Sequence, residues 1–60
     1  MNPETVADAR GFVYEPARGP KRRVLYEPRS DGRFERIESV WTGCTWRPTG
    51  REIVENVYRI

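Results

Sequence analysis

Residues 22–41, RRVLYEPRSDGRFERIESVW, decide the predicted fold, because a turn signal separates two runs of strand-favouring residues. The turn signal is Ser-Asp-Gly, in which glycine supplies the positive φ that a tight turn requires. In the second run, a strand would place Ile37 and Trp41 on one face. Phe34 and Val40 would take the other. A helix would gather all four on one stripe, but the run follows Asp-Gly without an N-cap and ends at Thr-Gly. The stretch therefore predicts a β-hairpin.

A short repeated sequence pattern predicts a further strand towards the N-terminus. FVYEPAR (12–18) and VLYEPRS (24–30) share an apolar pair followed by Tyr-Glu-Pro. Two copies are too few for a solenoid, which requires at least three stacked units. Proline lacks the N–H that a sheet ladder uses, and it favours extended geometry in the residue before it. Each Tyr-Glu-Pro therefore predicts the end of a strand.

The stretch VWTGCTWRPTG (40–50) holds the only cysteine, Cys44, between the only two tryptophans. The chain has no histidine to activate a thiol, and the ligands of a zinc site converge nowhere. Cys44 is therefore interpreted as a small buried or half-buried residue at a turn, with no catalytic or metal role. Trp41 and Trp46 are expected to form a core pair across this turn, the alternative being a partly exposed aromatic platform with Arg47. The Pro-Thr-Gly after Arg47 is expected to end the short strand that follows this turn.

The C-terminal residues 50–60 fit two structures. As a helix, their apolar residues form one stripe, and Thr49 to Glu52 matches a capping box. As a strand, they benefit from their β-branched residues, whereas so short a helix has weak propensity. We expect a strand, so the predicted fold is mainly β, a single small antiparallel sheet or meander of three to five short strands. The alternative is an α+β fold with a C-terminal helix from about 50 to 59.

Length and composition predict a single domain in a reducing compartment. Sixty residues make at most one domain, and residues 1–10 hold so few apolar side chains that we expect a flexible N-terminal tail before a domain over 11–60. A secreted domain this small would usually carry several cysteines rather than one. No signal-peptide pattern or long apolar run is present. The expectation is a cytoplasmic protein that does not enter a membrane.

Positive charge is concentrated in residues 17–36, which contain seven basic and three acidic residues and so carry a net charge of plus four. Arginine forms phosphate forks and stacks on aromatic groups. The best prediction is therefore a small non-enzymatic protein that binds DNA or RNA through an arginine-rich β-surface with aromatic stacking. The predicted contact residues are Arg18, Lys21, Arg22, Arg23, Arg29, Arg33, Arg36 and Arg47, with Tyr26 and Trp46 as stacking aromatics.

Other function classes receive less support from the sequence. It has no phosphate-binding glycine loop, nucleophile elbow or convergent set of catalytic groups, so we expect no enzyme activity, no cofactor and no small-molecule substrate. The alternative function is a protein-interaction module or a homodimer, in which strands that are apolar on both faces pack against another chain. Glutamates interleaved with the arginines favour this alternative, because they would interrupt a continuous basic patch.

Overall fold

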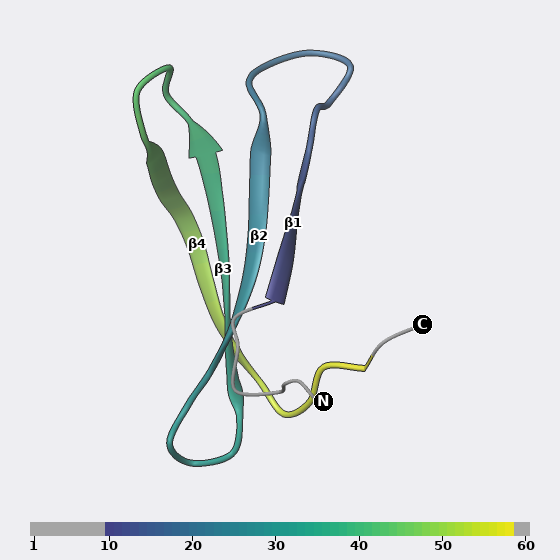
Figure 1. Cartoon of the computed structure of the whole chain (residues 1–60), viewed down its shortest axis with the longest axis vertical. Helices are drawn as coiled ribbons and strands as arrows, with labels where there is room; N and C mark the ends of the chain where they lie inside the picture. The colour runs from purple at the N-terminus through teal and green to yellow at the C-terminus, as the bar shows by residue number, and fades with distance from the viewer. Residues whose placement is uncertain (1–9, 59–60) are drawn as a thin grey trace, which may run out of the picture.

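The computed structural model describes residues 10–58, which form one four-stranded antiparallel sheet (Figure 1). The strands are β1 (Arg10–Tyr14), β2 (Arg22–Pro28), β3 (Phe34–Trp41) and β4 (Trp46–Val54), and they pair in the order β1-β2-β3-β4. No helix occurs within 10–58, so the mainly β meander is confirmed and the C-terminal helix is wrong for the described residues. The predicted tail lies outside the described residues except for Arg10, the first residue of β1.

The central hairpin forms as predicted from β2 and β3. Gly32 has a φ of 87°, and the Arg29 N–H donates to the Arg33 carbonyl oxygen at 2.8 Å to close the turn. The register places Leu25 opposite Ile37. The hairpin is thus held by its turn glycine together with an apolar cross-strand pair.

The two Tyr-Glu-Pro copies lie at the ends of two strands that pair with each other. β1 ends at Tyr14, as predicted, and the loop to β2 contains Gly19 at a φ of 91°. β2 continues beyond its tyrosine to Pro28, which lies opposite Phe34. The second copy therefore marks the strand end at the proline itself.

β4 corrects one expectation. The Pro-Thr-Gly at 48–50 does not end the strand that follows the turn, because the pairing of β3 with β4 shifts register between Glu38 and Ser39. Ser39 pairs with Pro48 and Glu38 with Gly50, so one extra residue is accommodated in a bulge. β4 is an edge strand, where a proline without an N–H is tolerated. The strand then runs on to Val54.

The turn at 42–45 contains Cys44, as predicted. The Thr42 N–H donates to the Thr45 carbonyl oxygen at 2.9 Å, and Thr42 Oγ1 accepts from the Thr45 N–H at 3.2 Å. Gly43 has a φ of 101°. The expected burial of Cys44 is wrong, because this turn projects from the end of the sheet and leaves the cysteine exposed.

The two faces of the sheet carry different side chains, because directly opposite residues of paired strands share a face. The Phe12 face, as we name it, carries Arg10, Phe12, Tyr14, Arg22, Val24, Tyr26, Pro28, Phe34, Arg36, Glu38, Val40, Arg47, Glu52 and Val54. The Trp46 face carries Val13, Arg23, Leu25, Glu27, Glu35, Ile37, Ser39, Trp41, Trp46, Pro48, Arg51 and Ile53. Within 10–58, the buried residues are only Val24, Ile37 and Ser39. The strands thus form a single layer with little core.

Candidate nucleic-acid interface

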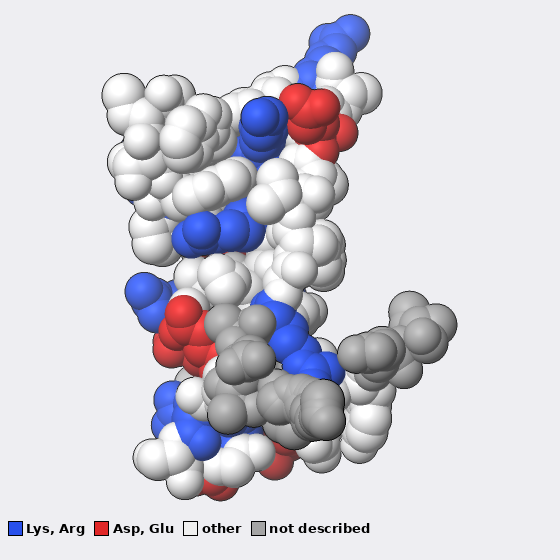
Figure 2. Space-filling view, in the orientation of Figure 1, with Lys and Arg blue, Asp and Glu red and all other residues white. Residues whose placement is uncertain are grey.

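The predicted contact residues are divided between the two ends of the sheet. The β1–β2 loop and the β3–β4 turn lie at one end, and the β2–β3 turn lies at the other (Figure 1). The first end holds Arg18 and Lys21 in the loop, Arg22 and Arg23 at the start of β2, and Trp46 and Arg47 at the start of β4. Arg29 and Arg33 flank the opposite turn, while Tyr26 and Arg36 lie between the ends. On the face drawn in Figure 2, the basic residues accordingly form separate areas rather than one continuous patch.

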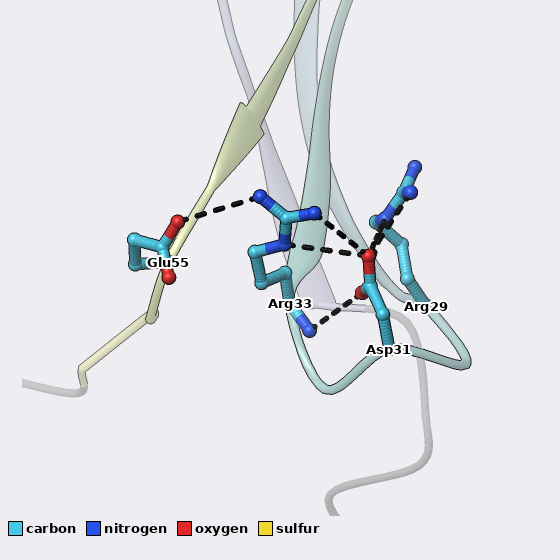
Figure 3. A network of polar contacts seen from close by, with 4 residues as sticks. All are labelled: Arg29, Asp31, Arg33 and Glu55. Carbon is cyan, nitrogen blue, oxygen red and sulfur yellow. Dashed lines mark hydrogen bonds and ion pairs between the residues drawn. The ribbon is translucent and has the colours of Figure 1, made fainter.

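At the β2–β3 turn, the arginines are balanced by carboxylates (Figure 3). Asp31 Oδ2 lies 3.1 Å from Arg29 Nη2 and 3.1 Å from Arg33 Nη2, and Asp31 Oδ1 accepts from the Arg33 N–H at 3.0 Å. Arg33 also lies 3.5 Å from Glu55. The hydrogen bonds from Arg29 and from the Arg33 backbone hold the pKa of Asp31 well below its usual range. Two arginines here face two carboxylates, so this end presents little net charge to a phosphate.

Arg36, in the middle of the Phe12 face, is also engaged. It forms an ion pair with Glu38, two residues along the same strand and on the same face. Its pKa is raised by the hydrogen bonds to Glu38 and then to Tyr26. Tyr26 is half-buried beside it. Neither predicted contact is free to meet a ligand without breaking this arrangement.

The loop end of the sheet is different. We call Arg18, Lys21, Arg22, Arg23 and Arg47 the basic end, and within the described part of the chain none of them forms an ion pair. One acidic residue, Glu15, lies in the same loop, so five positive charges less one leave a local balance of plus four. This concentration is the strongest electrostatic feature for attracting an anionic partner.

Trp46 is a packed residue rather than an open platform. Its ring centroid lies 5.3 Å from that of Trp41, directly opposite on β3, and the Arg23 guanidinium carbon lies 4.9 Å from the Trp46 ring centroid. The predicted pairing of the tryptophans is confirmed, although both are half-buried at the sheet surface rather than enclosed in a core. With Trp41 and Arg23 beside it, Trp46 offers a base little free ring surface.

Two exposed aromatics that the sequence interpretation did not select lie on β1. Phe12 is 56% exposed and Tyr14 is 45% exposed, with ring centroids 6.4 Å apart. Both occupy the Phe12 face, where the register aligns Tyr14 with Arg22, Val40 and Arg47 in one row. The available signal was their i, i+2 spacing, which puts them on one face of any strand. This row places the exposed ring of Tyr14 on the same face as two arginines of the basic end, with Phe12 next to Tyr14.

Comparisons with protein-family models, with curated proteins and with solved structures give no match to this chain. Within residues 10–58, no group of three or more histidine, cysteine, aspartate or glutamate side chains could hold a metal ion. The same residues contain no helix long and apolar enough to span a membrane.

Proposed function

We propose that the protein binds single-stranded nucleic acid on the Phe12 face, at the basic end of the sheet. The observation that carries this proposal is the row of Tyr14, Arg22, Val40 and Arg47, with Phe12 beside Tyr14. Exposed rings on a sheet offer platforms for unstacked bases, and nearby arginines meet the phosphates between them. Duplexes hide their base faces, so stacking of this kind selects single strands.

Electrostatics support placing the phosphate contacts at the basic end. Arg22 and Arg47 flank Val40 on the Phe12 face, and Arg18 and Lys21 extend the positive charge into the adjoining loop. By contrast, Arg29, Arg33 and Arg36 have carboxylate partners that a phosphate would have to displace. We therefore restrict the phosphate contacts to Arg18, Lys21, Arg22 and Arg47 and assign the stacking contacts to Phe12 and Tyr14. Arg23 is left out because it lies on the Trp46 face, over the ring of Trp46.

The test is the salt dependence of affinity for labelled single- and double-stranded DNA and RNA. Each phosphate contact in a single strand contributes about 0.7 to the slope of log affinity against log salt. The double variant Arg22→Gln with Arg47→Gln should weaken single-strand binding and flatten this slope by about 1.4. The matched double variant Arg29→Gln with Arg33→Gln removes the same charge at the other end and should leave the slope unchanged. Equal slopes for both variants, or no binding at low salt, would contradict the proposal.

A second candidate, self-association or binding to another protein, is favoured by the small core. In addition to Phe12 and Tyr14, Val13 and Ile53 are 53% and 43% exposed on the Trp46 face. A small isolated sheet gains stability when such side chains are covered. An association of this kind should survive moderate salt, because apolar contacts carry it.

A further inference from the structure

Within residues 10–58, the sheet has two unpaired edges, β1 and β4, and they differ in how well they resist further pairing. The β4 edge carries Pro48 and the bulge at Thr49, both of which disturb a continuous ladder. Thr49 Oγ1 also donates to the Glu38 carbonyl oxygen at 3.3 Å. The β1 edge, RGFVY, has no proline, its pairing to β2 shows no register shift, and its one charged residue is Arg10 at its start. Bulges, prolines and charges protect edge strands, so β1 is the unprotected edge.

β1 is also the strand with the most exposed apolar side chains. Phe12 and Val13, on opposite faces, are each more than half exposed, and Tyr14 is 45% exposed. A strand that added to this edge would cover part of both faces at once. It would also pair the outward-facing backbone N–H and C=O groups of β1.

We propose that the occupant of this edge is β1 of a second copy of the chain, paired antiparallel about a two-fold axis perpendicular to the sheet at Phe12. Directly opposite residues must share a face, so the sequence numbers of each pair must add to an even total. A total of 24 is the choice that pairs all five β1 residues. It sets Phe12 against the partner subunit's Phe12, Arg10 against the partner subunit's Tyr14, and Gly11 against the partner subunit's Val13.

This register is self-complementary in chemistry as well as in length. An aromatic pair forms at the axis, and an arginine lies beside a tyrosine ring at both ends. Shifting the axis to Val13 sets Gly11 against the partner's Glu15, beyond the end of β1. Shifting it to Gly11 leaves Val13 and Tyr14 without a partner inside the strand. Each shift leaves two β1 residues without a partner inside the strand, whereas the arrangement centred on Phe12 leaves none.

The dimer would extend the nucleic-acid site, a consequence that rests on the proposed function. A two-fold axis perpendicular to the sheet keeps the Phe12 faces of both copies on one side. Phe12 and Tyr14 would then continue into the partner's Phe12 and the partner's Tyr14. The Arg22 and Arg47 pairs of the two copies would lie on either side of this aromatic strip. A single strand could cross the axis and contact both copies.

Disulfide trapping tests the register without any nucleic acid. Opposite residues of antiparallel strands have Cα atoms about 4.5–5.5 Å apart, within the range that a disulfide bridges. In a Cys44→Ser background, Phe12→Cys should therefore form a covalent dimer under mild oxidation. Val13→Cys in the same background is the matched control, because its two copies would be about 8 Å apart. Equal trapping of both variants, or none of Phe12→Cys, would overturn the proposal.

Charge pairing at the axis gives a second readout. Phe12→Glu and Phe12→Lys should each be monomeric by sedimentation, because each places like charges opposite one another. Mixing the two should restore the dimer, whereas the unmodified chain should dissociate reversibly on hundredfold dilution. A monomeric mixture, or an unmodified chain that is monomeric throughout, would refute the pairing. A dimer that binds no nucleic acid would support the β1 pairing and contradict the proposed function. A monomer that binds nucleic acid would contradict the pairing and support the proposed function.

Discussion

The guanidinium of Arg23 lies over the ring of Trp46, with its central carbon 4.9 Å from the ring centroid. Arg23 and Trp46 come from β2 and β4, so this contact spans β3 on the Trp46 face. Trp41, on β3, pairs with Trp46 from directly opposite. These three side chains tie together the three strands that carry most of the sheet. A cation over an aromatic ring at such a surface site stabilises by about 0.5–1 kcal/mol.

Truncating this cluster should destabilise the sheet. Because Trp46 is half-buried, Trp46→Ala should lower the free energy of unfolding by about 2 kcal/mol, less than the 3–5 typical of a fully buried tryptophan. Trp46→Phe keeps an aromatic ring beside Arg23 and should cost less than half as much. Urea unfolding followed by circular dichroism measures both. Equal losses for the two variants would show that the aromatic contacts do not matter.

Glycine should be required at position 11. A Cβ on Gly11 would overlap the carbonyl oxygen of Val24 on β2, which backbone atoms cannot easily relieve. Gly11→Ala should therefore displace β1 and cost about 1–3 kcal/mol, the usual range for overpacking. Gly50→Ala is the matched control, since its Cβ would meet only Glu38 Oε1 at 3.9 Å. Hydrogen exchange should show faster exchange in β1 for the first variant alone. Unchanged protection of β1 in Gly11→Ala would contradict this close approach of the strands.

Acid should weaken the β2–β3 turn through Asp31. Its pKa is lower in the folded chain than the unfolded value of about 4. Below that value the unfolded chain takes up a proton that the folded chain does not. The stabilisation is therefore present above pH 4 and is lost as the pH falls through the unfolded value towards the lower folded one. Asp31→Asn should flatten the acid limb of melting temperature against pH.

Glu55 provides the control for that experiment. It faces Arg33 at 3.5 Å, but its side chain is 81% exposed, and such pairs contribute little. Glu55→Gln should keep the acid limb of the unmodified protein. If the two variants give the same curve, the Asp31 network is not what stabilises the turn.

The sequence predicted the local features of this fold better than the strand neighbours. The Ser-Asp-Gly turn and the two faces of β3 follow from glycine's conformational freedom and the two-residue period of a strand. The prediction that Pro48 ends its strand was wrong, because a proline is excluded from a central strand but tolerated in an edge strand. The sequence alone does not show which strands are edges. Bulge formation depends on the partner strand in the same way. The edge position of β4 and its bulge therefore both depend on long-range strand pairing, which the sequence does not show.

The candidate site shows the same division. Tyr14 and Tyr26 occupy equivalent places in the two Tyr-Glu-Pro copies, but β1 is an edge while β2 has neighbours on both sides. Tyr26 therefore packs beside Arg36, and Tyr14 stays exposed. The pairing of Arg36 with Glu38 was open to prediction, because residues two apart on a strand share a face. The clustering of Arg47 with Arg22 required the complete strand order.

Base stacking on β1 can be distinguished experimentally from phosphate contacts. Phe12→Leu and Tyr14→Leu keep β1 apolar but remove an aromatic face, so each should weaken single-strand binding by about 1–3 kcal/mol, or about 5- to 150-fold. The salt slope should stay constant, because no phosphate contact is lost. Tyr26→Leu is the matched control on the same face and should leave affinity nearly unchanged, since that ring is half-buried beside Arg36. Fluorescence polarisation at two salt concentrations measures affinity and slope together, with circular dichroism confirming that each variant folds. A loss confined to Tyr26→Leu would move the stacking site to the sheet interior, and a change in slope for Phe12→Leu would mean that β1 acts through the arginines instead.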